Sequence, residues 1–515
     1  MFDKIEKILY NYQKDVVEIV LKNDKGVIVM PTGTGKTFVQ AAILAKTIIE
    51  NKNKFGIYVI NAPRIMLSYQ LMKEVYKFLT SNEFGLNIEA RYFGVHSGRL
   101  DGADEDFELI RSETNIPFSE INASTSTLEL KKIIKKARKQ DLPLVLFSTY
   151  HSSTRIEEAR KGLVKDIELV LNDEAHYLVS NQFHDNIDIL KTKKQFFFTA
   201  TTKITASDSG QGMNNVDVFG EEIFKMTPRE AIELGKMIRP RLHFVKSNQS
   251  ITKENLDKNI GKLISESFRE HDYIINNLVP KMMVTVNGSK DMHNFMDSSE
   301  YDILIGSGVN IYMVHSNSDI GNMINGEQYS RLDWLTKLKE DGANPDKRLI
   351  VMHYNIITEG IDVPGLTGVL LLRSLKKSSF IQTFGRVARV QEFDKKRIDS
   401  GKILPTELKK MLKPFSYIIL PSIIAEDMDN IEYLSNLIYS LREFDFNTSE
   451  DIVITETTAN GLPEPIDGGD ALISIKKRLP NIDVILEKLE AEYEDELLAS
   501  LSTTEEILDF FNEKL

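Results

Sequence analysis

The chain has 515 residues, which exceeds what one hydrophobic core supports, so two or three domains are expected. Its content of 42% hydrophobic and 27% charged residues is that of an ordinary globular protein. The absence of cysteine excludes disulfides, iron–sulfur clusters, thiolate zinc sites and a cysteine nucleophile. No apolar run is long enough to cross a membrane, and the N-terminus is charged too evenly for a signal peptide. We therefore expect a cytoplasmic protein with no membrane segment.

The net charge of −12 is unevenly distributed. Residues 421–515 hold 23 Asp and Glu against 6 Lys and Arg, a charge of −17, which leaves +5 on the other 420 residues. An acidic C-terminal part thus follows a slightly basic body. Nucleic acid can bind in a local groove of such a protein, whereas non-specific coating of DNA is not expected.

The first part of the chain alternates short β-branched runs with longer amphipathic stretches. Strands are predicted at 26–31 and 56–63, with helices after them at 36–50 and 64–80. Further strands are predicted at 142–150, 166–176 and 194–202. This alternation is typical of a parallel sheet. The polar segment 97–127 reads as a surface insertion, either a disordered loop or a substrate-facing element.

A second alternating series follows residues 238–244, and its strands are predicted at 282–286, 311–314, 348–352, 368–372 and 417–420. Residues 461–469 read as a loop. Apolar residues then recur at helical spacing through 482–501, which predicts a helix packed on the second domain or, alternatively, a partner-binding helix. The chain is therefore expected to be an α/β protein with tandem parallel-sheet domains at 1–237 and 238–425. A mainly helical, acidic extension is expected at 426–515.

The stretch "VIVMPTGTGKT", residues 27–37, ends a predicted strand and opens a predicted helix. Glycines in it allow backbone N–H groups to close around phosphate oxygens, and the helix N-terminus adds positive potential. Lys36 can reach the terminal phosphates, and the Thr37 hydroxyl can ligate Mg²⁺. The sequence therefore predicts an ATP site formed by Thr32, Gly33, Thr34, Gly35, Lys36 and Thr37.

The stretch "IELVLNDEAH", residues 167–176, carries two adjacent carboxylates to the end of a predicted strand. Ligands of open parallel sheets bind at this edge. We predict that Asp173 holds Mg²⁺ through its water shell and that Glu174 polarises the attacking water.

The stretch "QTFGRVARV", residues 382–390, would place Gln382, Arg386 and Arg389 on one face of a helix. Their partner could be water, a carboxylate, a nucleic-acid phosphate or a nucleotide bound elsewhere on the chain. With a P-loop in the other domain, the bound triphosphate is favoured. Arg389 is the first choice for the γ-phosphate and Arg386 the second, with Gln382 positioning water or phosphate, although spacing does not separate the two arginines.

Together with further motifs in the same order, these stretches resemble a superfamily 2 helicase of the DEAD/DEAH group. The further motifs are "LYNYQ" (9–13), "NAPRIMLSYQ" (61–70), "FSTYHS" (147–152), "FFFTATT" (196–202) and "NIITEGIDVPGL" (355–366). The sequence between the third of these and residue 240 is similar to the translocase lobes of type I and type III restriction enzymes. The resemblance implies two tandem RecA-like P-loop domains that use ATP and Mg²⁺.

The resemblance also implies roles for single residues. Gln13 would read the adenine edge, with Tyr10 or Tyr12 stacking on the base. Gly360 and Asp362 would lie at the hinge between nucleotide and nucleic acid. Nucleic-acid contact and coupling would fall to Arg64, Thr149, His176, Thr199, Thr201 and Thr358.

The function implied is an ATP-dependent helicase or translocase, acting on DNA rather than RNA, of a bacterial, phage or mobile-element type. An RNA helicase is one alternative. The other is an ATP-gated switch that clamps nucleic acid and recruits a protein partner through the acidic extension. A nuclease is not predicted, because the E-x-K at Glu407 and Lys409 lies in a lysine-rich helical stretch with no strand-borne aspartate before it.

Overall fold

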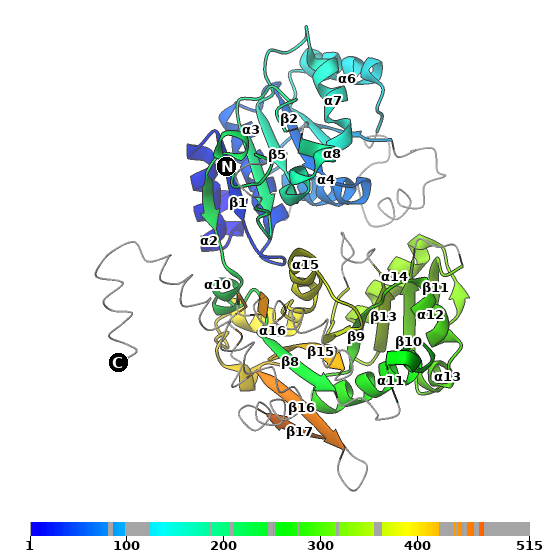
Figure 1. The fold of residues 1–515 in the computed structure, drawn as a ribbon. Coiled ribbons are helices and arrows are strands. Elements are labelled where there is room, and N and C mark those ends of the chain that lie inside the picture. Colours follow the sequence, from blue (N-terminus) through cyan, green and yellow to red (C-terminus); the bar gives the residue numbers. More distant parts are fainter. Residues whose placement is uncertain are drawn as a thin grey trace. The chain divides into compact units, whose positions relative to one another are not determined.

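The structure is a computed structural model that describes residues 2–80, 86–97, 123–184, 187–204, 210–245, 251, 253–275, 278–315, 319–354, 363–421, 451–457 and 463–467, with single positions between 437 and 446. The chain divides into two compact units, the first built on Met1–Ala231 and the second on most of the chain from Ile232 onward. In each, helices surround a central sheet (Figure 1). Among the described residues, no helix combines the length and apolar character needed to cross a membrane. Outside the described residues lie the predicted helix 482–501, most of the predicted insertion, and Thr358, Gly360 and Asp362.

The sheet of the first unit has, within the described residues, the strand order β3-β4-β2-β5-β6-β1-β7. Every neighbouring pair is parallel, so the carboxyl ends of all these strands lie along one edge. The strands are β1 (Lys25–Val29), β2 (Ile57–Ala62), β3 (Arg91–Val95), β4 (Leu144–Thr149), β5 (Leu169–Asn172), β6 (Gln195–Thr199) and β7 (Glu222–Lys225).

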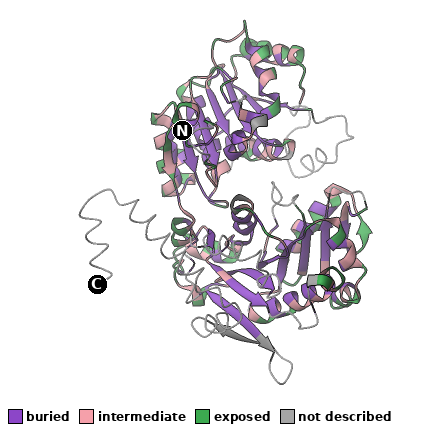
Figure 2. Cartoon of the chain, viewed as in Figure 1, coloured by how far each residue is buried: buried purple, intermediate pink, exposed green. Residues whose placement is uncertain are grey.

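Helices cover both faces of this sheet. The apolar sides of α6 and α7 pack on β2 and β4. The central helix α3 packs between α2 and α4 and is buried from Val39 to Ile48, because it is enclosed on several sides (Figure 2). The helices are α1 (Phe2–Ile8), α2 (Asn11–Lys22), α3 (Lys36–Glu50), α4 (Ile65–Thr80), α6 (Thr127–Gln140), α7 (Ser153–Arg160), α8 (Asn181–His184), α9 (Val216–Phe219) and α10 (Pro228–Glu233), with short 3₁₀ turns η2 (Tyr150–Ser152) and η3 (Ala175–Val179).

The sheet of the second unit has the order β12-β11-β10-β13-β9-β14-β15-β8-β16-β17 among its described strands. The run from β10 to β16 is parallel, and antiparallel strands are added at both edges. The strands are β8 (Pro240–Val245), β9 (Lys281–Thr285), β10 (Val309–Val314), β11 (Asn322–Ile324), β12 (Glu327–Gln328), β13 (Arg348–His353), β14 (Gly368–Leu371), β15 (Ser416–Pro421), β16 (Ile452–Thr457) and β17 (Pro463–Asp467).

The helices from this part of the chain are α11 (Leu256–Ile274), α12 (Ser289–Met296), α13 (Ser299–Gly306), α14 (Arg331–Ala343), α15 (Lys377–Val387) and α16 (Glu392–Asp399), with 3₁₀ turns η5 (Lys253–Asn255) and η7 (Leu408–Lys410). The long helix α11 has a continuous apolar side, from Ile260 to Phe268, that packs into the main core of the unit. Strand β9 lies near the middle of the sheet and is buried along its whole length.

The predicted α/β class with tandem parallel sheets is confirmed, with one correction. Residues 461–469 were expected to be a loop, but β17 (Pro463–Asp467) pairs antiparallel with β16. Both strands fall within the expected extension 426–515, most of which lies outside the described residues, and they extend the second sheet. Proline has no backbone N–H to donate to a neighbouring strand. Pro463 and Pro465 are tolerated because they lie two residues apart on an edge strand, so that the backbone nitrogen of each can face the unpaired side.

Candidate active site

The P-loop leaves β1 at the carboxyl edge of the first sheet and enters α3. Its backbone turns through Gly33 at φ 88° and Gly35 at φ 85°, a left-handed region that favours glycine. The Thr34 hydroxyl donates to Pro31 O at 2.7 Å, which fixes the turn. Because α3 begins at Lys36, the first backbone N–H groups of this helix adjoin the loop. N–H groups at the start of a helix can bind an anion such as phosphate.

Gln13 packs directly against this loop. Its Nε2 donates to Thr34 O at 3.1 Å, and its Oε1 accepts from the backbone N–H of Tyr10 at 3.1 Å. A Cβ at Gly35 would lie 2.5 Å from Gln13 Nε2, so any other residue there would displace the Gln13 side chain as well as strain the left-handed backbone. Tyr12 also donates to Thr34 O, at 2.7 Å, and its ring is stacked with that of Tyr10 at 5.9 Å. The predicted adenine-binding residues thus lie together beside the P-loop.

Asp173 follows β5 and lies close to the P-loop helix. Gln40 on α3 donates from Nε2 to Asp173 Oδ1 at 2.7 Å. Burial raises the pKa of Asp173 from 3.8 to about 7, and the charge of Glu174 adds to the rise. Lys36 and the Gln40 hydrogen bond act in the opposite direction. A carboxylate desolvated in this way would gain strongly from a nearby cation.

Lys36 and Thr37 are half-buried at the start of α3. Lys36 Nζ donates to Met30 O at 3.2 Å, which holds the ammonium across the mouth of the loop. Gln40 was missed by sequence reasoning, because a glutamine one helical turn beyond Lys36 has no signal until β5 is known to lie beside α3. Among the described residues, no three His, Cys, Asp or Glu side chains gather as a metal site.

His176 connects the Asp173–Glu174 turn to the end of β6. Its Nδ1 lies 3.1 Å from Thr199 Oγ1 in a hydrogen bond and 3.5 Å from Glu174 Oε2. Burial lowers the pKa of His176, against the opposing effect of Glu174, so the ring is neutral near pH 7. Thr199 Oγ1 donates to Thr201 O at 2.7 Å. The structure brings together the three residues expected to couple the nucleotide site to strand movement.

The expected nucleic-acid contacts of the first unit follow neighbouring strands. Arg64 follows β2 and its side chain is exposed. Thr149 ends β4, but its buried hydroxyl is hydrogen-bonded to Ser152 Oγ at 3.0 Å. The exposed residue of this segment is His151, which lies against Phe183.

In the second unit, α15 carries Gln382 and the buried Arg386, but it ends at Val387. The expectation of one helical face for three residues is therefore wrong for Arg389. This residue follows the helix and pairs antiparallel with Met237. The chain leaves the helix there because Ala388 O accepts from Ile238 N–H, at 2.7 Å, rather than from a further helical residue.

Lys413 holds the end of this arginine segment and was also missed by sequence reasoning. The buried ammonium donates to Val387 O and, at 3.0 Å, to Arg389 O. Ser416 Oγ donates to Val387 O at 3.0 Å. Burial lowers the pKa of Lys413 from 10.5 to about 7, and the charge of Arg389 contributes. Such a contact depends on β15 lying beside the end of α15, which no local pattern shows.

Comparison with known proteins shows what this chain is similar to. The family model for the res subunit of type III restriction enzymes matches residues 6–204, which lie in the first unit. No curated protein matches the chain. The DNA-bound type ISP restriction-modification enzyme LlaBIII superposes with a TM-score of 0.58 at 18% identity, covering 85% of this chain and 30% of that enzyme. A nuclease-deletion mutant of the type ISP enzyme LlaGI, in complex with a DNA substrate mimic, gives 0.53 at 20% identity and covers 87% and 30%.

RNA-bound Dbp5 of S. cerevisiae gives a TM-score of 0.49 at 15% identity, covering 91% of this chain and 92% of that protein. The present chain spans 30% of the length of each of the two restriction-modification enzymes. The fold is the one predicted from the motifs. The first unit is similar to the res subunit of type III restriction enzymes, and the fold of the chain is similar to part of the type ISP restriction-modification enzymes.

Proposed function

We propose that this protein is a nucleic-acid-dependent ATPase that couples ATP hydrolysis to movement along DNA. The observation that carries the proposal is the Gln40–Asp173 hydrogen bond of 2.7 Å. It joins the P-loop helix α3 to the strand end that presents the two carboxylates. The phosphate-binding and the carboxylate elements of an ATPase thus lie side by side within one unit.

The residues present fit ATP and Mg²⁺. The P-loop offers the N–H groups at the start of α3 and the Lys36 ammonium to phosphate oxygens. Thr37 and Asp173 would hold Mg²⁺ together with the phosphates, which is a typical arrangement for an ion that keeps few protein ligands. When bound, Mg²⁺ neutralises charge on the phosphate oxygens. Glu174 would orient and polarise the attacking water.

The arginines of the second unit would stabilise the charge that develops on the γ-phosphate. An arginine in that role is worth about 10³- to 10⁵-fold in rate. Arg389 remains our first choice and Arg386 the second, with Gln382 positioning water or phosphate. Lys413 supports this role, because its bonds to Val387 O and Arg389 O fix the backbone that carries both arginines.

DNA is favoured over RNA as the polymer. Two solved structures with TM-scores above 0.5 are restriction-modification enzymes in complex with DNA or with a mimic of it. Arg64 would contact a backbone phosphate, and Thr358, Gly360 and Asp362 would couple the polymer to the nucleotide. Contacts to the backbone carry little sequence information, so binding should weaken with salt and vary little with sequence.

The test is ATP turnover of the full chain with single-stranded DNA, duplex DNA and RNA, each at several salt concentrations. We expect DNA to raise turnover several-fold, and RNA to raise it less. Lys36→Ala is the control, because it removes the phosphate-binding ammonium while leaving the fold of α3 intact.

The outcomes separate the candidate functions. Equal turnover with and without every polymer would overturn the proposal. Stronger stimulation by RNA than by DNA would favour the RNA helicase. Turnover that persists in Lys36→Ala would show that the measured activity belongs to a contaminant or another site.

A further inference from the structure

Tyr150 lies beneath the turn that presents the two candidate catalytic carboxylates. The side chain is fully buried, and its hydroxyl donates to the backbone oxygen of Asp173 at 2.5 Å. Burial and the nearby carboxylates raise the pKa of Tyr150 well above 10, so the hydroxyl remains a donor at any working pH. None of the expected roles of the helicase motifs uses this residue.

The turn above Tyr150 is held in an unfavourable conformation. Glu174 has φ 48°, in the left-handed region that a residue with a side chain adopts only at a cost. Such a conformation persists where neighbouring contacts hold it. Asp173 N–H donates to Asn61 O at 2.8 Å, and Asp173 O accepts from Tyr150. Removing one of these bonds should allow the turn to relax and both carboxylates to shift.

Tyr150 belongs to a segment with one inward and one outward side. The turn η2 follows β4 directly, and within it Tyr150 is buried whereas its neighbour His151 is exposed. This is the segment expected to contact the nucleic-acid backbone. A polymer on its outer side would therefore lie one residue from a side chain that reaches Asp173.

The same segment has a second connection to the strands below. Ser153 Oγ donates to Asn61 Oδ1 at 3.3 Å, and Asn61 Nδ2 donates to Asn172 Oδ1 at 3.0 Å. Asn172 Nδ2 completes the chain with a bond to Phe196 O at 3.3 Å. These hydrogen bonds run from β2 through β5 to β6. The amide on β5, Asn172, directly precedes Asp173. Buried polar groups that are fully paired in this way favour a single arrangement of the strands.

We propose that Tyr150 is a positioning residue that transmits nucleic-acid binding at residues 149–153 to the backbone of Asp173 and Glu174. The inference rests on the proposed function, because it assumes that nucleic acid stimulates ATP turnover. In the absence of polymer the turn would sample relaxed geometries. Polymer bound on the outer side of the segment would hold Tyr150, and through its hydroxyl the turn, in the productive geometry.

The test is Tyr150→Phe in the full chain, which removes one oxygen atom and keeps the buried ring. Tyr58→Phe is the matched control. Tyr58 is equally buried, and its hydroxyl accepts one hydrogen bond from Asn51 Nδ2 at 2.9 Å. However, Tyr58 lies at the amino end of β2, at the opposite edge of the same sheet. For each protein we would measure turnover with and without single-stranded DNA, the DNA concentration at half-maximal stimulation, and the thermal unfolding midpoint.

The loss of one hydrogen bond should lower the ratio of stimulated to unstimulated turnover by about tenfold in Tyr150→Phe. The half-maximal DNA concentration should stay within about twofold, because no contact to DNA is removed. Tyr58→Phe should keep the wild-type ratio. Ser153→Ala, a milder change to the second connection, should lower the ratio in the same direction.

An unchanged ratio in Tyr150→Phe would overturn the inference. This holds whether both rates stay at the wild-type values or both fall equally, which is what a merely structural role predicts. If Tyr150→Phe fails to fold, an unchanged ratio in Ser153→Ala would overturn it. Wild-type turnover that no nucleic acid stimulates would instead refute the proposed function, and the inference would fall with it.

Discussion

Glu270 is a carboxyl group that the second unit keeps largely out of water. It lies on α11 and is 8% exposed, and Thr455 on β16 donates to its Oε2. Thr455 Oγ1 is also hydrogen-bonded to His243 Nε2 at 3.1 Å. Burial raises the pKa of Glu270 from 4.5 to about 7, and Glu266 adds to the rise. This group therefore makes the stability of the second unit depend on pH.

The sign follows from the raised pKa. The folded state binds the proton of Glu270 more tightly than the unfolded state does, so its contribution is complete below pH 4.5 and is lost as pH rises through about 7. Glu270→Gln keeps the shape without the charge and should remove this loss. Between pH 4.5 and 8, the free energy of unfolding should fall by about 3 kcal/mol more in the wild type than in the variant. Equal pH dependence in urea unfolding would contradict the assignment.

The candidate site shows which residues local sequence can identify. Lys36 and Thr37 were predicted, because the phosphate-binding loop is built from consecutive residues whose spacing is itself the signal. Gln40 and Tyr150 were not, since each acts on Asp173 from more than twenty residues away in the chain. Their roles depend on α3 and β4 lying near β5, which only the fold establishes.

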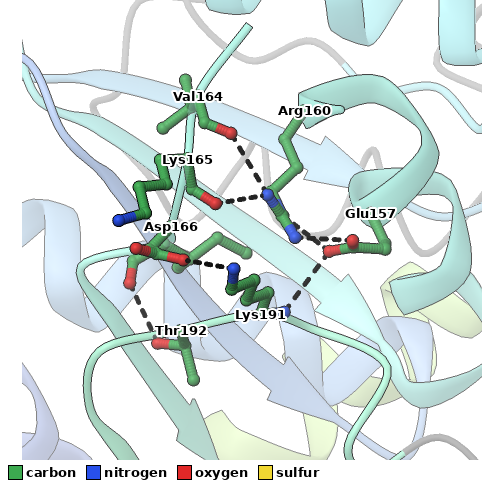
Figure 3. A network of polar contacts seen from close by, with 8 residues as sticks. Glu157, Arg160, Val164, Lys165, Asp166, Lys191 and Thr192 are labelled. Carbon is green, nitrogen blue, oxygen red and sulfur yellow. Dashed lines mark hydrogen bonds and ion pairs between the residues drawn. The ribbon is translucent and has the colours of Figure 1, made fainter. Parts of the chain in front are cut away.

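At the scale of elements, α7 is fastened to the first sheet by a buried arginine (Figure 3). Arg160 forms a bidentate pair with Glu157, with both N···O distances 2.6 Å. Its Nη1 donates to Val164 O at 3.1 Å and to Lys165 O at 2.7 Å. The backbone N–H of Lys191 also donates to Glu157 Oε2, at 3.3 Å. The cluster thus joins the segments that lead into β5 and β6 at their amino ends, away from the candidate site.

Arg160→Met should destabilise the first unit, because it leaves the largely buried carboxylate of Glu157, 12% exposed, without its arginine partner. Breaking such a pair costs about 3–5 kcal/mol. Arg155→Met is the control on the same helix: Arg155 pairs with Glu158 at 3.2 Å, but both side chains are about half exposed. An exposed pair is worth about 1 kcal/mol or less. Chemical unfolding that shows equal loss in the two variants would contradict the role given to Arg160.

Helices and strands were predicted correctly where the signal lies in consecutive residues of the sequence. Helix α3 was predicted over 36–50 and observed over Lys36–Glu50, because the P-loop fixes its start and apolar residues continue through it. Strand β7 (Glu222–Lys225) was missed, since two half-buried apolar residues between two exposed charged ones show no apolar alternation. Its position at the edge of the sheet, paired with β1, supplies the stability that its sequence does not indicate.

At the scale of the whole molecule, charge separates the chain into a body and an acidic part. The −17 of residues 421–515 accounts for more than the net charge of −12, so the rest of the chain is slightly basic. A body of this kind can bind a polyanion locally without coating it. We propose that the acidic residues of 421–515 repel nucleic acid or contact a protein partner.

We propose that ATP hydrolysis moves this protein along DNA. The most direct measurement is displacement of a triplex-forming strand from a duplex with free flanking DNA, with the wild type and Glu174→Gln at equal concentration. We predict that the wild type displaces the third strand only when ATP is hydrolysed. Glu174→Gln should bind the duplex in the presence of ATP and displace nothing. DNA-stimulated turnover in the wild type without displacement would contradict the claim and leave an ATP-gated clamp.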